Sequence, residues 1–403
     1  MLNRKFKILI VHNFYQQPGG EDTVFRNEKR LLEDNGHKVI IYTRDNSELK
    51  GNILKKIFLP FITIFNPKTY FDIKKIIKEK NIDIVHVHNT LCLISPAVFY
   101  AALKMKTPVV QTLHNFRMQC VNGLFYRDNH ICEDCLNKGF VSALKHKCYR
   151  NSFLQTLALI ISYKFHQMTG IYKKVNFICL TSFNKDKLLL INKNKKNVDV
   201  NKVYVKSNFV FDINDSKIHI NAKSNVDYDK KYLYVGRLDD IKGIDVVLEA
   251  FSNLKDCELN VIGSGGNEYI SKYNNFKNIN FLGQLPHEET LMEMKKSSAL
   301  IYPTKLYEGQ PVTIIEAYMN GLPVITSNIG NANEMVKDEI TGLHFVSGDV
   351  NSLIGVMNKF KGLNKEELKM NTRSEYDNYY SYDKGYKNIY DIYNHILKNI
   401  GGL

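Results

Sequence analysis

Two glutamates eight residues apart, Glu308 and Glu316, are the residues of this chain whose type and spacing best suit chemistry. Glu308 follows a short apolar run, which predicts a loop after a buried strand. Glu316 lies inside a helix predicted to begin near Pro311 and to end at Asn320-Gly321. Such a helix would point free amides and the positive end of its dipole into a crevice between the two carboxylates. This arrangement suits a nucleoside diphosphate with hydroxyls on either side.

Two cations, Arg237 and Lys242, follow the predicted strand Tyr232–Gly236. The carboxyl ends of parallel strands line the ligand crevice of an open α/β sheet. A cation pair there can neutralise a leaving diphosphate without a metal. Gly263 and Gly265 follow the next predicted strand and can bring backbone close to a base or a phosphate. Surface charges and a plain turn are the structural alternatives.

The loop containing Gly19, Gly20 and Glu21 opens the first predicted helix, Glu21–Asn35. Two glycines allow the backbone to approach a ligand, and the helix N-terminus offers amides to an anion. The alternative is a tight turn in which Glu21 complements the helix dipole. A full dinucleotide-binding fingerprint is missing, which disfavours an ordinary dehydrogenase.

Histidines end two neighbouring strands of the first half. His88 ends the predicted strand Asp83–His88, and His114 follows the predicted strand Val109–Leu113. Both should reach the same crevice, where contacts with substrate hydroxyls are expected, because no convergent carboxylate for a metal site is evident. His86 shares a face with His88 through strand alternation, and its default interpretation is structural.

Four cysteines cluster within an insertion at residues 118–151. Cys120, Cys132, Cys135 and Cys148 have the spacing C-x11-C-x2-C-x12-C, which fits a tetrahedral thiolate site for zinc. Separately buried thiols or a single redox pair are the alternatives. We expect a structural Zn²⁺ that orders this loop and has no part in catalysis.

The elements that must position these residues alternate between apolar strands and helices along 403 residues. This pattern predicts an α/β protein with two Rossmann-like domains facing across a cleft. The N-terminal domain should span 1–207 and the C-terminal domain 208–375, with the polar run 214–230 as a hinge region. A final helix within 376–403, expected over Tyr376–Leu397, should cross back to the first domain.

The net charge of +14 favours an acidic partner. Basic and apolar residues interleave over Lys50–Lys80 and Leu154–Lys174, which favours contact with an anionic membrane surface. A solvated lysine-rich surface and ordinary amphipathic helices are the alternatives. No signal peptide is visible, and the apolar runs are too short to span a bilayer, so we expect a cytoplasmic protein at the inner face of the plasma membrane.

Taken together, these residues resemble a known family. Gly19-Gly20, His114, the Arg237/Lys242 pair and Glu308-x7-Glu316 look like family 4 of the retaining nucleotide-sugar glycosyltransferases (glycosyl transferases group 1), which adopt the GT-B fold. The resemblance covers most of the chain, and residues 303–343 are its most specific part. It implies that the N-terminal domain, with the cysteine insertion, lies on the acceptor side and that the C-terminal domain binds the nucleotide-sugar.

The resemblance implies a role for each matching position. Glu316 would hold the ribose hydroxyls of the donor, and Glu308 would face its sugar. Arg237 and Lys242 would bind the diphosphate and stabilise it as the leaving group. His114 would contact the donor sugar. The remaining contacts implied are backbone amides at Val312 and Thr313 on the diphosphate, and Gly19-Gly20 against phosphate or acceptor.

The function expected is transfer of a hexose, with retention, from a UDP- or GDP-linked donor to a glycan or lipid-linked glycan in surface polysaccharide biosynthesis. No cofactor is expected in catalysis, since the single Asp-x-Asp match, Asp227-Tyr228-Asp229, lies in the polar run. A GT-B epimerase or phosphorylase is the alternative enzyme. A non-enzymatic basic module that binds membrane or nucleic acid is disfavoured, because no nucleic-acid-binding signature appears.

Overall fold

The computed structural model describes residues 4–16, 19–51, 53–192, 197–212 and 230–401. The chain divides into two compact units. The N-terminal unit comprises residues 1–125, 132–208 and 385–403, and the C-terminal unit comprises 126–131 and 209–384. Nearly all of the polar run 214–230, including Asp227-Tyr228-Asp229, lies outside the described residues.

A six-stranded parallel sheet forms the centre of the N-terminal unit, in the order β2-β1-β3-β4-β7-β8. Its strands are β1 (Lys7–Phe14), β2 (Lys38–Asp45), β3 (Ile84–Val87), β4 (Val109–Leu113), β7 (Asn176–Cys179) and β8 (Val203–Val205). Apolar runs such as Ile8–Val11 are fully buried, as is typical of a parallel sheet covered on both faces. The strand order reverses between β1 and β3, where α/β sheets open to ligands.

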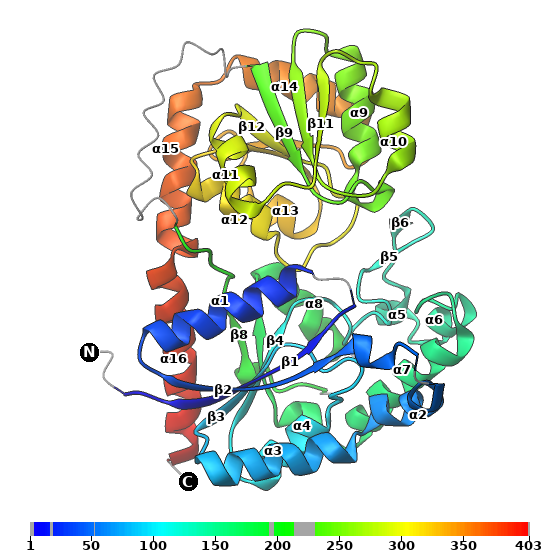
Figure 1. Cartoon of the computed structure of the whole chain (residues 1–403), viewed down its shortest axis with the longest axis vertical. Coiled ribbons are helices and arrows are strands. Elements are labelled where there is room, and N and C mark those ends of the chain that lie inside the picture. Colours follow the sequence, from blue (N-terminus) through cyan, green and yellow to red (C-terminus); the bar gives the residue numbers. More distant parts are fainter. Residues whose placement is uncertain (1–3, 17–18, 52, 193–196, 213–229, 402–403) are drawn as a thin grey trace. The chain divides into compact units, whose positions relative to one another are not determined.

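Helices cover both faces of this sheet (Figure 1). They are α1 (Gly20–Asp34), α2 (Ile53–Ile64), α3 (Pro67–Lys80), α4 (Ala97–Lys104), α7 (Phe153–Met168), α8 (Ser182–Leu189) and the part of α16 (Tyr382–Gly401) from Gly385. The insertion holds only short elements, namely β5 (Tyr126–Arg127), β6 (His130–Ile131), α5 (Asp134–Asn137) and α6 (Val141–Lys145).

Helix α1 presents one buried stripe, in which Val24, Phe25, Leu31 and Leu32 follow helical spacing. Glu28 lies on the same stripe and is also fully buried, which no hydrophobic pattern would anticipate. Helix α16 begins later than expected. Residues Tyr376–Tyr380 form one π-helical turn that ends at an extended Ser381, so that the helix starts at Tyr382.

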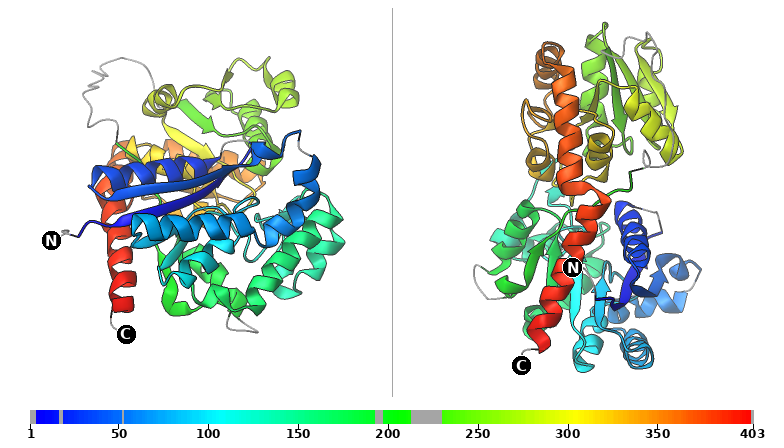
Figure 2. Two further views of the ribbon diagram at one scale, coloured as in Figure 1. Left: turned by 60° about the horizontal axis from the view of Figure 1, so that its bottom comes forward. Right: turned by 90° about the vertical axis from the view of Figure 1, so that its left-hand side faces the viewer.

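Within the N-terminal unit, α16 passes beside the start of β1 (Figures 1 and 2). Tyr390 stacks near Phe6, with ring centroids 5.6 Å apart, and its hydroxyl accepts the Arg4 backbone N–H at 3.1 Å. Tyr393 is fully buried and bonds to His86 at 2.7 Å. Aromatic side chains of the last helix therefore pack against β1 and β3, two interior strands of this sheet.

The C-terminal unit is built on a second six-stranded parallel sheet, in the order β11-β10-β9-β12-β13-β14. Its strands are β9 (Lys231–Val235), β10 (Glu258–Ile262), β11 (Ile279–Gly283), β12 (Ala299–Tyr302), β13 (Val324–Ser327) and β14 (Gly342–Phe345). Its helices are α9 (Ile244–Asn253), α10 (Asn267–Tyr273), α11 (His287–Lys295), α12 (Val312–Met319), α13 (Gly330–Met335), α14 (Val350–Lys361) and α15 (Lys365–Glu375). This is the strand order of a dinucleotide-binding fold, with its switch point between β9 and β12.

Close backbone contact joins the two strands at that switch point. Gly243 has φ +75°, and a Cβ at this position would lie 2.0 Å from the carbonyl oxygen of Pro303. Only glycine permits this approach, because it has no Cβ and adopts positive φ freely. The loop after β9 is thereby held against the end of β12, which places Lys242 beside the segment that carries Glu308.

Candidate functional site

An ion pair lies at the switch point of the C-terminal unit. Nζ of Lys242 is 2.6 Å from Oε1 of Glu308, and the hydroxyl of Thr304 donates to the same oxygen at 3.1 Å. Both charged side chains are partly exposed, at 25% for Lys242 and 15% for Glu308. Asn331 donates its amide to the carbonyl oxygens of Glu308 and Gly309, which fixes the loop that carries the glutamate.

Arg237 also follows β9 but is held less firmly. Its Nη2 lies 3.2 Å from Oδ2 of Asp239, and 65% of the arginine side chain is exposed. The backbone beneath it is fixed, since the Tyr234 hydroxyl donates to the Arg237 carbonyl at 2.7 Å. A mobile guanidinium on a rigid loop suits a ligand that arrives from solvent.

Helix α12 points an uncapped N-terminus at this region. Pro311 is its N-cap residue and provides no side-chain hydrogen bond, so the amides of Val312 and Thr313 receive no side-chain cap. The first turn contains no acidic residue that would complement the dipole. The helix therefore retains the ability to bind an anion at this end.

Glu316 lies further along α12 and is bonded to a residue that sequence reasoning missed. Its Oε1 is 2.8 Å from Nε2 of His287, the first residue of α11. The hydrogen bond to Glu316 raises the pKa of His287 above its usual range. Little in the sequence gives reason to select His287. It stands between a proline and two glutamates at the start of a helix, a pattern that does not indicate a ligand site.

The glycines after β10 form a tight backbone crossing. A Cβ on Gly263 would lie 1.8 Å from the carbonyl oxygen of Gly236, in the loop after β9. Gly265 has φ +88° and more room around it. The structure thus gathers the two glycines, Arg237, Lys242, Glu308 and the N-terminus of α12 at the carboxyl edge of one sheet.

Buried histidines meet at the corresponding edge of the N-terminal unit. Nδ1 of His88 is 3.0 Å from Nε2 of His114, and their rings stack with centroids 5.2 Å apart. His86 stacks on the other side of His88 at 4.6 Å. Burial lowers the pKa of His114 to about 3 and holds that of His88 well below its usual range, so both rings are neutral at physiological pH.

A buried carboxylate, which the sequence analysis did not identify, faces these histidines. Oε1 of Glu28 lies 2.9 Å from Nδ1 of His86 and 3.7 Å from Nε2 of His88. Its Oε2 is 2.7 Å from Nζ of Lys206, and both side chains are fully buried. Burial alone would raise the pKa of Glu28, but Lys206 and His86 hold it well below its usual range.

Glu28, His86 and His88 place three metal-ligating groups within 4.8 Å of one another, the one such group among the described residues. Lys206 already supplies a positive charge there, and His86 is further bonded to Tyr393 and Thr112. We interpret the group as an internal ion pair that fixes the histidines.

The carboxylate also determines which nitrogen of each ring carries the proton. Ionised Glu28 favours a proton on Nε2 of His88, which leaves Nδ1 of His88 as an acceptor. Nε2–H of His114 then donates to it, and Nδ1 of His114 is left as an acceptor. These tautomers are assigned from the position of the carboxylate.

The Gly19-Gly20 turn begins α1 and carries two carboxylates in its first helical turn. The Gly19 amide donates to Oδ2 of Asp22 at 3.0 Å, while Oδ1 of Asp22 is 2.7 Å from Nε2 of His12. Glu21 is partly buried near Arg117, and desolvation raises its pKa. This helix N-terminus is therefore already complemented by acidic groups, unlike that of α12.

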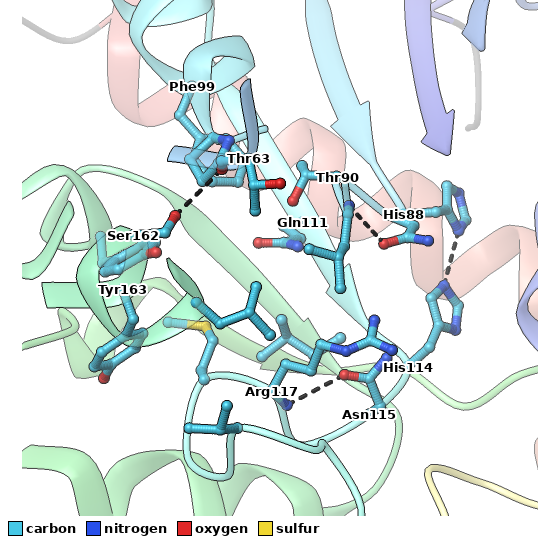
Figure 3. A pocket seen from close by; sticks show the side chains of 18 of the residues that line it. Thr63, His88, Thr90, Phe99, Gln111, His114, Asn115, Arg117, Ser162 and Tyr163 are labelled. Atoms are coloured by element: carbon cyan, nitrogen blue, oxygen red, sulfur yellow. Dashed lines mark hydrogen bonds between the residues drawn. The ribbon is translucent and has the colours of Figure 1, made fainter. Parts of the chain in front are cut away.

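A cavity of about 130 Å³ opens beside His114. Figure 3 shows side chains from β4, α2, α4 and α7 surrounding it, with polar Gln111, Thr90 and Arg117 among aromatic Phe99 and Tyr163. Mixed polar and aromatic walls of this kind are typical of carbohydrate or other polar ligand sites.

All seven cysteines are free thiols. Within the insertion, the thiols of Cys120 and Cys135 are hydrogen-bonded to each other, and Cys148 lies close enough to Cys135 to act on it electrostatically. The backbone N–H of Cys132 bonds to the carbonyl of Phe125 at 2.8 Å. Cys120, Cys135 and Cys148 are therefore near one another, and the backbone of Cys132 is tied to the turn that follows Cys120.

Helices α2 and α7 pack together in the N-terminal unit (Figure 1) and expose large apolar side chains. The exposed residues described there are Phe58, Phe61, Phe153, Leu154, Ile161, Phe165 and Met168. Among the described residues, no helix combines the length and the apolar character that crossing a membrane requires.

Comparison with known families gives two matches. Residues 215–376 match the model described as glycosyl transferases group 1, and residues 18–143 match that of glycosyltransferase family 4. The N-terminal match ends within the insertion, and the C-terminal match contains Arg237, Lys242, Glu308 and Glu316.

Three relatives are similar over part of this chain. An uncharacterised 42.6 kDa protein of the cps region of Klebsiella pneumoniae is 25% identical over 77% of this chain and 75% of its own length. A second protein of that region, of 41.2 kDa, is 26% identical, and there the alignment spans only 31% of this chain and 35% of the relative. The UDP-Gal:α-D-GlcNAc-diphosphoundecaprenol α-1,3-galactosyltransferase of Escherichia coli is 33% identical over 26% of this chain and 27% of its own.

Solved structures share the fold over nearly the whole chain. A glycosyltransferase from Rickettsia africae aligns with a TM-score of 0.70 and 20% identity, covering 98% of this chain and 99% of that one. HepE from Anabaena, solved in complex with UDP-glucose, aligns with a TM-score of 0.60 and 14% identity, covering 99% and 100%. The two Rossmann-like units thus have the GT-B architecture expected from the sequence.

Proposed function

We propose that this chain, which belongs to the family 4-type group 1 glycosyltransferases, transfers a hexose from a UDP- or GDP-linked donor to a glycan or lipid-linked glycan. The transfer would retain the anomeric configuration and need no catalytic metal. The observation that carries the proposal is the Lys242–Glu308 pair at the switch point of the C-terminal sheet, beside the uncapped N-terminus of α12.

The leaving diphosphate accounts for this arrangement chemically. Breaking the glycosidic bond to phosphate builds negative charge on the diphosphate and positive charge on the anomeric carbon. Lys242, Arg237 and the first amides of α12 would stabilise the negative charge, and the carboxylate of Glu308 would lie on the sugar side. Fixed groups of this kind favour the transition state because they need no reorganisation when the charge develops.

The nucleotide end would be held by Glu316, whose carboxylate can accept hydrogen bonds from two ribose hydroxyls. His287 would keep that carboxylate in place through its bond at 2.8 Å. Nδ1 of His114, in the N-terminal unit, would accept a hydrogen bond from a hydroxyl of the donor sugar. The acceptor proton would pass to a phosphate oxygen in a front-face transfer, since no enzyme nucleophile is identifiable.

Two relatives support the choice of substrates. HepE was crystallised with UDP-glucose, and the E. coli relative is named for transfer to a diphosphoundecaprenol-linked sugar. A lipid-linked acceptor is consistent with the apolar side chains that α2 and α7 expose, which could rest in the headgroup region of an anionic membrane.

The leaving-group role is tested with Lys242→Met. Loss of one such group should lower kcat by about 10²–10³. Lys305→Met is the matched control. Lys305 forms a similar ion pair with Asp245 in place of Glu308, in which Nζ and Oδ2 are 2.6 Å apart. Equal activity of the two variants would refute the role. A strict requirement of turnover for added Mg²⁺ or Mn²⁺ would refute metal-independent catalysis.

The nucleotide role is tested with Glu316→Gln, measured as the affinity for UDP and GDP by calorimetry. Loss of charge-assisted hydrogen bonds worth about 1.5–3 kcal/mol should weaken binding roughly ten- to hundredfold. Unchanged affinity for both nucleotides would remove Glu316 from the site. Incubation with the donor alone separates transfer from epimerisation, since an epimerase needs no acceptor.

Membrane contact is tested by flotation with vesicles that contain anionic phospholipid. Phe61→Asp should reduce the bound fraction, because it places a charge on the apolar surface of α2. Met370→Asp is the control, as Met370 is similarly exposed but lies on α15 of the C-terminal unit. Equal binding by both variants would exclude this surface.

A further inference from the structure

We propose that Cys120, Cys132, Cys135 and Cys148 bind one structural zinc ion that holds the insertion at residues 118–151 in shape. Their spacing provides four thiolates, the ligand set that selects zinc in closed tetrahedral sites. The structure adds that Cys120 and Cys135 are in contact, that Cys148 lies near Cys135, and that backbone amides face two of the sulfurs.

The first observation is the contact between cysteines far apart in the sequence. Cys120 lies in the loop that follows β4, and Cys135 lies in α5. Their thiols are hydrogen-bonded to each other. Cys148 approaches Cys135 from the turn after α6. No three cysteine sulfurs among the described residues lie within 4.8 Å of one another. Metal binding would therefore draw the outer two sulfurs toward the Cys120–Cys135 pair.

The second observation concerns the backbone around these sulfurs. Amides of Asn122, Gly123 and Phe125 point at the sulfur of Cys120, and the amide of Val121 points at that of Cys135. Backbone amides in this position can donate hydrogen bonds to the sulfurs of a metal site. One turn, residues 121–125, thus faces both sulfurs with its amides.

The third observation is that the insertion contains only short pieces of regular secondary structure. Its elements are two to five residues long, too short to form a core of their own. Six of its non-glycine residues have positive φ angles, a conformation that must be imposed by surrounding contacts: Phe125, Asp128, Asn129, Lys147, Arg150 and Asn151. A tetrahedral metal supplies such contacts in segments that lack a hydrophobic core.

The insertion also contributes to the cavity beside His114. Met118, Val121 and Phe140 line it, and Met118 and Phe140 also line a neighbouring cavity of about 380 Å³ that includes Cys135. Zinc would therefore order one wall of the 130 Å³ cavity. If that cavity binds the acceptor, a consequence that rests on the proposed function, removal of zinc should raise the KM for acceptor and leave donor affinity unchanged.

The test is metal analysis of the full chain, purified without chelators. We expect about one zinc per chain, and a cobalt-substituted protein with the visible absorption of tetrahedral cobalt thiolate. Cys132→Ser and Cys148→Ser should each lose the metal. Cys92→Ala is the matched control, because Cys92 is partly buried like Cys132 but lies outside the cluster, and it should retain the full complement.

A variant that fails to fold would be uninformative by itself, so the wild-type protein supplies a second measurement. Titration with a mercurial should release zinc in step with modification of four thiols, and limited proteolysis within residues 118–151 should accelerate upon release. Four reactive thiols without zinc, a disulfide in the cluster, or iron in place of zinc would each overturn the proposal. None of these measurements uses transferase activity, so a wrong function assignment would not affect them.

Discussion

Neutralising the carboxylate of Glu28 should destabilise the N-terminal unit far more than neutralising an exposed glutamate on the same helix. Glu28→Gln removes the carboxylate that lies 2.7 Å from the fully buried ammonium group of Lys206. Breaking a buried pair by removing one partner costs about 3–5 kcal/mol. Glu33→Gln is the control, because Glu33 pairs with Lys29 at the same 2.7 Å but both side chains are well exposed.

The two distances are equal, so the comparison isolates burial. An exposed pair at i,i+4 contributes about 0.3–0.5 kcal/mol, since water and salt screen it. For a unit of roughly 200 residues, 1 kcal/mol shifts the midpoint of thermal unfolding by about 2–4 °C. Glu28→Gln should therefore lower the midpoint by about 6–20 °C, and Glu33→Gln by no more than about 2 °C.

The assay must report on the N-terminal unit by itself. Thermal unfolding followed by circular dichroism gives the midpoint, and hydrogen exchange of peptides from α1 and β3 assigns the transition to this unit. The double variant Glu28→Gln/Lys206→Met should recover part of the loss, because it removes both charges. Equal midpoints for the two single variants would show that the buried pair is not what stabilises this unit.

Three further predictions follow from the geometry. Gly243→Ala should destabilise the C-terminal unit by about 1–3 kcal/mol more than Gly283→Ala. Both glycines have positive φ, but only a Cβ at position 243 would clash, with the carbonyl of Pro303. Equal midpoints of urea unfolding for the two variants would contradict this prediction. Burial lowers the pKa of His114 to about 3 and that of His166 to about 4, so the unfolded chain binds more protons than the folded chain below pH 6.5. The free energy of unfolding should therefore fall as the pH drops from about 6.5 toward 4, by up to about 1.4 kcal/mol per pH unit for each histidine. A free energy of urea unfolding that does not change with pH in this range would contradict the prediction. Finally, ¹⁵N NMR should show that the proton of His114 is on Nε2 in the wild type. His88→Leu should remove this preference for the Nε2–H tautomer, whereas His166→Gln should leave it unchanged. A proton on Nδ1 in the wild type would refute the tautomers assigned from the position of Glu28.

Most of the architecture could be predicted because buried parallel strands leave a strong signal. The apolar runs at Ile8–Val11 and Val109–Leu113 became β1 and β4, as expected. The predicted helix over Tyr376–Leu397 was wrong at its start. Tyrosines and polar residues there are compatible with a helix, but a π-helical turn and an extended Ser381 interrupt it before Tyr382.

The positions of the candidate site residues were predictable to the extent that they follow strands. Lys242 and Glu308 lie after β9 and β12, and the carboxyl ends of those strands must meet because the strands pair directly. His88 and His114 meet for the same reason, after the paired strands β3 and β4. Their roles in substrate binding remain predictions.

By itself, the sequence determined which strands are buried, where the turns require glycine, and which charged groups stand at strand ends, because these depend on local periodicity. Only the tertiary structure decided the pairing of Glu28 with Lys206, 178 residues apart, and of Glu316 with His287. Such partners depend on how a helix packs against its sheet or its neighbour, and no local pattern records that. The cysteines stand between these cases: their spacing indicated a shared site, and the fold brought Cys120 and Cys135 together.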